Sequence, residues 1–137
     1  MINITEIMDM LDWNMPYEIQ YKGRNLAKEL EVIKPFIQPL TPKHNKNVWE
    51  NCAFIVADKS DEQLLPYLTD LLEWLQDMNW PGAFCIYNRL NKLNSTHFDV
   101  ILNNTIEKSR LLKDDMWTET LCKLKSDRNS GTYSSLL

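Results

Sequence analysis

Glycine is scarce in this sequence, with only three residues in 137, Gly23, Gly82 and Gly131. Gly-rich phosphate-binding loops and the tight turns of small β-barrels need several residues that tolerate positive φ, so the composition argues against both kinds of protein. Histidine is also rare, and neither His44 nor His97 stands beside a cysteine at a metal-ligand spacing. We therefore expect no metal site and no cofactor.

Long apolar runs are missing as well. No window approaches the roughly 20 apolar residues that a membrane-spanning helix needs, and residues 1–16 contain no positively charged leader. The three cysteines, Cys52, Cys85 and Cys122, are odd in number, widely spaced and set among apolar residues, as reduced core thiols are. These features predict a cytoplasmic protein without a disulfide framework.

What the sequence does contain is a globular composition, with 44% hydrophobic residues, five tryptophans and six methionines. A chain of this length buries roughly two-thirds of its unfolded surface in one core. Apolar positions recur at helical spacing nearly throughout, without sustained alternation of period two. We predict an all-α domain over residues 1–126 and a polar tail over residues 127–137, which is either mobile or docked through Tyr133 and Leu136.

About seven helices are predicted. The clearest covers residues 61–78, where Ser60 and Gln63 form a capping-box signature before a stripe of leucines. Prolines at positions 35, 39 and 42 exclude a continuous helix between residues 34 and 47. The other helices are expected at residues 4–11, 16–33, 47–57, 80–93, 96–112 and 115–125.

Two stretches of the chain resemble each other. Residues 4–11 and 68–75 match in chemical type at nearly every position, and a D-x-N-x-P motif follows at residues 12–16 and 77–81. A fainter third copy begins at residue 114, where Trp117 aligns with Trp80 and Cys122 with Cys85. Repeated helix pairs are typical of α-solenoids, because each pair buries its apolar stripe against the next. We predict a short HEAT-like or armadillo-like superhelix, with an irregular helical bundle as the alternative.

The D-x-N-x-P motif is predicted to form the corner between the two helices of a pair. The side chains of Asn14 and Asn79 are expected to accept from free N–H groups of the next helix, while Pro16 and Pro81 end the preceding one. Two arginines at equal distances from these prolines are expected to hydrogen-bond the corner loop, and binding of a carboxylate or phosphate is the alternative. The remaining predicted corner residues are Arg24, Trp80 and Arg89.

The string LLEWLQDMNWP at residues 71–81 is similar to a motif of a bacterial family of domains of unknown function, family 5071. The string KDDMW at residues 113–117 resembles the closing motif of that family, so the resemblance covers about residues 47–117. It implies a small, HEAT-like helical protein without an established activity. Only the internal repeat supports the residues before position 47.

The net charge of −4 is unevenly distributed. Residues 61–88 contain five acids and no lysine or arginine, whereas residues 89–137 contain eight basic and six acidic residues. Three of the five acids follow i, i+3, i+7 spacing, which places them on one face of the predicted helix, away from the leucines. The repeat places three further acids at matching positions. These six residues, which we call the acidic set, are Asp70, Glu73, Asp77, Glu6, Asp9 and Asp12.

The acidic set is either an ordinary solvated surface or a docking site for a basic protein. We predict a non-catalytic protein-interaction module that binds neither nucleic acid, because of its net negative charge, nor membranes. Charge and family analogy suggest an antitoxin-like immunity protein that neutralises a cationic toxin.

Two other functions stay open. A small-molecule-binding or enzymatic protein is expected to have a pocket near Arg89 and Trp80, with Cys85 and His97 as nucleophile and base, although Cys85 lies in an apolar run. A structural, oligomer-forming protein is the other alternative.

Three tryptophans have two possible places. Trp13, Trp74 and Trp80 lie in or beside the corners, where they form either an exposed aromatic patch or part of the core. Core packing is the commoner fate of aromatic residues at helical spacing.

Overall fold

The computed structural model describes residues 3–39 and 46–130, and all regular secondary structure in these residues is helical. The predicted all-α fold class is confirmed. The elements, with 3₁₀ helices labelled η, are α1 (Ile4–Met10), α2 (Tyr17–Lys28), η1 (Lys34–Phe36), η2 (Lys46–Val48), α3 (Trp49–Ala57), α4 (Asp61–Leu64), η3 (Leu65–Tyr67), α5 (Leu68–Glu73), η4 (Trp74–Gln76), α6 (Ala83–Asn91), α7 (Thr96–Leu111) and α8 (Asp115–Ser130).

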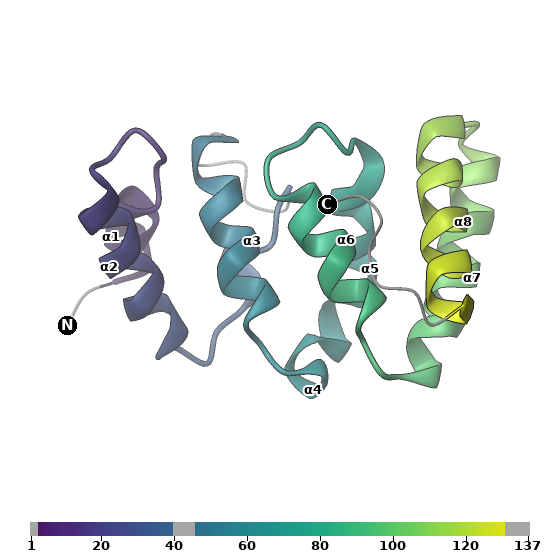
Figure 1. Ribbon diagram of the computed structural model, residues 1–137, viewed down its shortest axis with the longest axis horizontal. Coiled ribbons are helices and arrows are strands. Elements are labelled where there is room, and N and C mark those ends of the chain that lie inside the picture. The colour runs from purple at the N-terminus through teal and green to yellow at the C-terminus, as the bar shows by residue number, and fades with distance from the viewer. Residues whose placement is uncertain (1–2, 40–45, 131–137) are drawn as a thin grey trace.

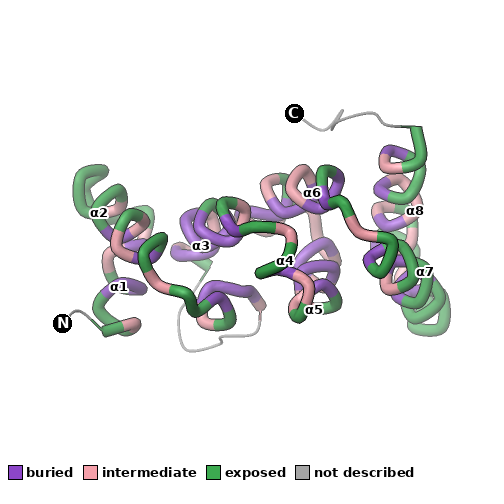
Figure 2. Tube along the Cα trace, turned by 90° about the horizontal axis from the view of Figure 1, so that it is seen from below, coloured by how far each residue is buried: buried purple, intermediate pink, exposed green. Residues whose placement is uncertain are grey.

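The helices stand side by side in chain order along the long axis of the molecule, from α1 and α2 at one end to α7 and α8 at the other (Figure 1). In the turned view, α2, α3, α6 and α8 form one layer, while α1, α5 and α7 lie in a second (Figure 2). Within the first layer α2 packs on α3, α3 on α6, and α6 on α8, whereas α5 packs on α7 in the second. We call these the front layer and the back layer.

The predicted helix at residues 61–78 is interrupted. Its start is as expected, because the Ser60 hydroxyl accepts from the Gln63 N–H and the Gln63 side chain accepts from the Ser60 N–H. Pro66 then brings the chain into η3, because proline supplies no N–H to an α-helical ladder. The segment therefore consists of α4, η3, α5 and η4, and the prediction of one continuous helix is wrong.

Three further boundaries differ from prediction by more than two residues. Helix α2 ends at Lys28 instead of residue 33, α6 begins at Ala83 instead of residue 80, and α8 continues to Ser130 instead of ending at residue 125. Residues 127–130 therefore belong to the last helix, while Tyr133 and Leu136 lie outside the described residues. Within residues 3–39 and 46–130, no helix is both long and apolar enough to span a membrane.

The core lies between the two layers and includes most of the tryptophans. Trp74 is fully buried, and its indole N–H donates to the Pro81 carbonyl oxygen at 3.1 Å. The Trp49 ring meets the rings of Trp74 and Trp80 edge-on, with centroids 6.2 and 5.4 Å away. Trp80 is half-buried and Trp13 is exposed. The core alternative therefore holds for Trp74, and these three residues do not form an exposed aromatic patch.

Candidate interaction surfaces

The two D-x-N-x-P corners have the same local structure. The Asp12 carboxylate accepts from the Asn14 N–H, and the Asp77 carboxylate accepts from the Asn79 N–H, in both cases at 2.8 Å. Aspartate commonly stabilises a turn through the N–H two residues further on. The repeat seen in the sequence is therefore matched by the turns, and two members of the acidic set have a structural role inside them.

The predicted capping role of Asn14 and Asn79 is wrong. The residue that precedes α2 is Pro16 and the residue that precedes α6 is Gly82, and neither helix start has a side-chain cap. Gly82 has a φ of 84°, and a Cβ atom there would lie 2.6 Å from the Ala53 Cβ. The second corner is thus closed by backbone geometry that favours glycine and by close packing on α3.

On α5 the acidic set is partly balanced by basic neighbours. Burial, and then the nearby Glu73 charge, raise the pKa of the Asp70 carboxyl, whereas the Lys34 charge acts in the opposite direction. The Glu73 carboxylate pairs with the Lys108 ammonium of α7 at 3.3 Å. Basic side chains from η1 and α7 therefore meet the acids of α5 from two sides.

The other members of the acidic set lie elsewhere. Glu6 and Asp9 are exposed on α1, which stands at the end of the row away from α5 (Figure 1). Asp12 and Asp77 lie in the corners. The structure therefore brings Asp70 and Glu73 together, but it does not join all six residues into one continuous surface.

Arg89 forms the predicted internal contacts, but with a different partner. Its guanidinium donates to the Ala57 and Lys59 carbonyl oxygens at 3.1 and 2.8 Å, and to the Asp61 carboxylate at 2.6 Å. These groups belong to the end of α3 and the start of α4, not to the corner loop. Arg89 thus caps the C-terminal end of α3, where free carbonyl groups attract a cation.

Two further basic residues, which no sequence pattern singled out, cap front-layer helices. The Arg128 guanidinium donates to the Leu90 and Leu93 carbonyl oxygens at 2.8 and 2.7 Å and pairs with Asp99 at 3.2 Å. The Lys59 ammonium donates to the Leu30 carbonyl oxygen at 2.9 Å. One sequence signal could have indicated the Arg128 contact: Asp99 is an acid in the first turn of α7, the helix that follows the capped helix α6.

Arg24 differs from these three residues. Its guanidinium carbon lies 5.3 Å from the centroid of the Phe54 ring and 5.9 Å from that of the Tyr21 ring. Its Nε is shielded from solvent and has no hydrogen-bond partner among the described residues. Arg24 contacts α3 from α2, whereas Arg89 contacts α3 from α6. Equal spacing from the two prolines therefore did not give the two arginines equal surroundings.

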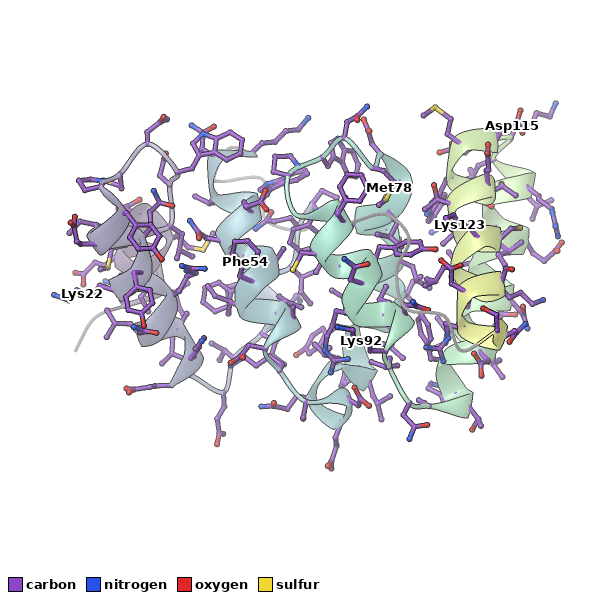
Figure 3. The ribbon with its side chains drawn as sticks, viewed as in Figure 1. Lys22, Phe54, Met78, Lys92, Asp115 and Lys123 are labelled. Atoms are coloured by element: carbon purple, nitrogen blue, oxygen red, sulfur yellow. The ribbon has the colours of Figure 1, made fainter. Side chains whose placement is uncertain are left out.

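The front layer has three open grooves between successive helices. The α2–α3 groove has a volume of about 130 Å³, the α3–α6 groove about 400 Å³, and the α6–α8 groove about 310 Å³. Phe54 lines the first two grooves and Phe84 lines the last two. Figure 3 shows Phe54 of α3 and Lys92, the residue after α6, on this side of the molecule. Both phenylalanine side chains are exposed.

The enzymatic alternative needs a pocket near Arg89 and Trp80 with Cys85 as nucleophile and His97 as base. Cys85 lines the groove at Arg89, and burial, together with the Glu50 charge, raises the pKa of this thiol to about 11, which disfavours a thiolate nucleophile. His97 is exposed in the first turn of α7. Trp80 lines a neighbouring groove of about 250 Å³ that also includes Cys85. In the described part of the chain, no three histidine, cysteine or acidic residues cluster as metal ligands.

The fold and its surface define a two-layered, all-helical protein with open grooves along one layer. Residues 40–133 match the family described as Domain of unknown function (DUF5071), and the chain belongs to this family. The predicted family resemblance is thus confirmed, over a longer segment than residues 47–117. No curated protein and no solved structure matches the chain.

Proposed function

We propose that this protein is a non-catalytic module that binds another protein through its front layer, and that its row of helix pairs is a short HEAT-like solenoid. One observation carries the proposal: large apolar side chains are exposed on every front-layer helix. Exposed apolar side chains that gather on one side and are rimmed by polar residues commonly mark interfaces. We call this set the front aromatic face, and it consists of Tyr17, Tyr21, Phe54, Phe84 and Met116.

The grooves connect the members of this face. Tyr21 and Phe54 line the first groove, Phe54 and Phe84 the second, and Phe84 and Met116 the third. The Tyr17 and Tyr21 rings stack on α2, with centroids 6.1 Å apart. A partner that follows the grooves thus meets a large apolar anchor at each front-layer helix, aromatic on α2, α3 and α6 and a methionine on α8. A few such anchors account for most of the free energy of binding in typical interfaces.

The contacts of the groove residues favour binding over catalysis. The Arg89 guanidinium is already engaged by two carbonyl oxygens and the Asp61 carboxylate. The raised pKa of Cys85 keeps its thiol protonated near neutral pH. Neither side chain is therefore prepared for acid, base or nucleophilic chemistry.

The acidic set supports an alternative form of the proposal, in which a basic partner binds α1 and α5 of the back layer instead. Glu6 and Asp9 are exposed on α1, and Asp70 and Glu73 lie on one face of α5. A cationic toxin is the kind of partner that would complement these charges, and it would compete with Lys108 for Glu73. The immunity role and the cytoplasmic location stay predictions.

The test compares two surface variants with the wild type. Phe54→Ser/Phe84→Ser removes two anchors of the front aromatic face, and Asp70→Lys/Glu73→Lys reverses charge on α5. Proteins captured by the wild type from the source cell are purified, and their dissociation constants are measured by calorimetry. We expect the first variant to bind at least about tenfold more weakly and the second within about twofold.

The other outcomes each have a defined meaning. If only the charge-reversal variant loses binding, the partner uses the acidic set and the front layer is the wrong surface. If both variants bind as the wild type does, the proposal is wrong. Sedimentation of the purified protein tests the oligomer alternative, because a stable dimer that dissociates in the Phe54→Ser/Phe84→Ser variant would show that a second copy covers the face.

A further inference from the structure

We propose that Arg24 binds a carboxylate of the partner, and that the partner presents this carboxylate on an extended segment with an apolar side chain beside it. The inference rests on the proposed function, and it names the chemistry of the segment that occupies the grooves around Phe54.

The environment of Arg24 is that of an anion receptor without an internal anion. The guanidinium contacts the Tyr21 and Phe54 rings, and its Nε–H is shielded from solvent without a partner among the described residues. Asp58 lines the same groove but pairs with Lys28 at 4.0 Å. Arg24 lines this groove, so a carboxylate that enters it can accept charge-assisted hydrogen bonds from the guanidinium.

The other two half-buried arginines of the front layer show which ligand this chemistry takes. Arg89 and Arg128 each hold a carboxylate, from Asp61 and Asp99, together with main-chain carbonyl oxygens. Arg24 has neither kind of acceptor in residues 3–39 and 46–130. Guanidinium groups pair with carboxylates in a planar, two-point geometry, so a carboxylate from another chain would take at Arg24 the place that Asp61 and Asp99 take at Arg89 and Arg128.

The α3–α6 groove indicates which side chain of the partner lies beside the carboxylate. Phe54 and Phe84 line the α3–α6 groove, which is large enough for an apolar side chain. Asn88 lines it too, and its side-chain amide can hydrogen-bond a main-chain group of a bound segment. The second groove thus favours a polypeptide over a free anion.

The spacing of the two grooves sets the length of the segment. Packed helices are about 8–10 Å apart, so neighbouring interhelical grooves are separated by a similar distance. In an extended peptide, side chains at positions i and i+2 point the same way and lie about 7 Å apart. An acidic residue and an apolar residue separated by one position therefore suit the two grooves.

The test uses N-acetylated, C-amidated tripeptides and needs no variant for its first result. Asp-Ser-Phe and Phe-Ser-Asp present the acid and the ring in the two directions, and Asn-Ser-Phe and Phe-Ser-Asn are their uncharged counterparts. Binding is followed by the ¹H–¹⁵N signal of the Arg24 Nε–H. We expect a saturable shift with at least one acidic peptide, with a dissociation constant at least about fivefold below that of its uncharged counterpart.

Variants then locate the effect. Arg24→Lys should remove most of the preference for the acidic peptide, because lysine lacks the planar fork, whereas Arg110→Lys on the exposed side of α7 should keep it. If acidic and uncharged peptides bind equally, and Phe54→Ser weakens both, the carboxylate inference is wrong while the proposed function stands. If no peptide shifts the Arg24 signal up to about 10 mM, the inference is also wrong.

Discussion

The Arg89 guanidinium and the Asp61 carboxylate are joined by an ion pair of 2.6 Å that connects α6 to the start of α4. The same guanidinium caps the last carbonyl groups of α3. The Asp61 carboxylate in turn accepts from the Asn94 N–H, which precedes α7. One pair of side chains thereby connects four helices.

Replacement of this arginine should destabilise the fold. Arg89→Met keeps the aliphatic stem but removes three hydrogen bonds from a side chain that is only 14% exposed. We expect the free energy of unfolding to fall by about 2–3 kcal/mol in urea titrations. Lys125→Met on the exposed side of α8 is the matched control, with a change within about 0.5 kcal/mol. Equal stability of the two variants would show that the ion pair contributes nothing.

The Asp61 carboxylate should make the free energy of unfolding decrease as the pH falls. Partial burial alone would raise the pKa of its carboxyl, but the hydrogen bonds from Arg89 and Asn94 and the charges of Arg89 and Arg128 together lower it. A carboxyl with a lowered pKa stabilises the fold above its unfolded pKa of about 3.9, and this stabilisation is lost as the pH falls through the folded pKa. The stability difference between the wild type and Asp61→Asn should therefore narrow from pH about 5 to about 3. Chemical denaturation at several pH values measures it, and a constant difference would contradict the assignment.

The hydrogen bond between α6 and α8 should matter at high pH. The Tyr87 hydroxyl donates to the Asp127 carboxylate at 2.6 Å, and burial, this bond and the Asp127 charge raise the pKa of Tyr87. Stability from a raised pKa is complete below the unfolded value of about 10 and is lost as the pH rises beyond it. We expect Tyr87→Phe to cost about 1–2 kcal/mol at neutral pH, and less above pH about 10. The exposed Tyr17→Phe serves as control, and a loss that does not change with pH would show that folding does not raise the pKa of Tyr87.

The close contact at Gly82 should appear as an interaction between two positions. Gly82→Ala puts a Cβ at positive φ and 2.6 Å from the Ala53 Cβ, so we expect a loss of about 2–4 kcal/mol. Ala53→Gly alone should cost about 1 kcal/mol, because it places glycine inside α3. The double variant should be more stable than the sum of the two losses predicts, since it removes the steric contact. Thermal unfolding of the four proteins measures the difference, and strict additivity would show that φ alone sets the cost.

The helical class, the capping box at Ser60 and the position of the corners could be predicted, because each depends on residues close together in sequence. Aspartate two positions before the corner asparagine also signals the observed turn. Pro66 could have predicted the break between α4 and α5, but the leucine stripe continues on both sides and masked it. The last turn of α8 could not be predicted, because its polar sequence is held by contacts of Asp127 and Arg128 with α6.

Helical periodicity could not predict which side chains surround the candidate site residues. Helical spacing correctly placed Asp70 and Glu73 on one face, yet their basic neighbours come from η1 and α7. Equal sequence positions likewise gave Arg24 and Arg89 different partners, because α2 and α6 lie on opposite sides of α3. The packing of the layers determines which helices are neighbours, and the neighbouring helices supply the charges that pair with each residue.

The capping side chains of the front layer all act backwards along the chain. Lys59 caps the end of α2, Arg89 the end of α3 and Arg128 the end of α6. Each donor follows its acceptors by roughly one helix pair. Because synthesis runs from the N-terminus, each set of acceptors is made before the residue that completes it. The protein should consolidate in steps during synthesis, and α6 stays incomplete until the last turn of α8 has been made.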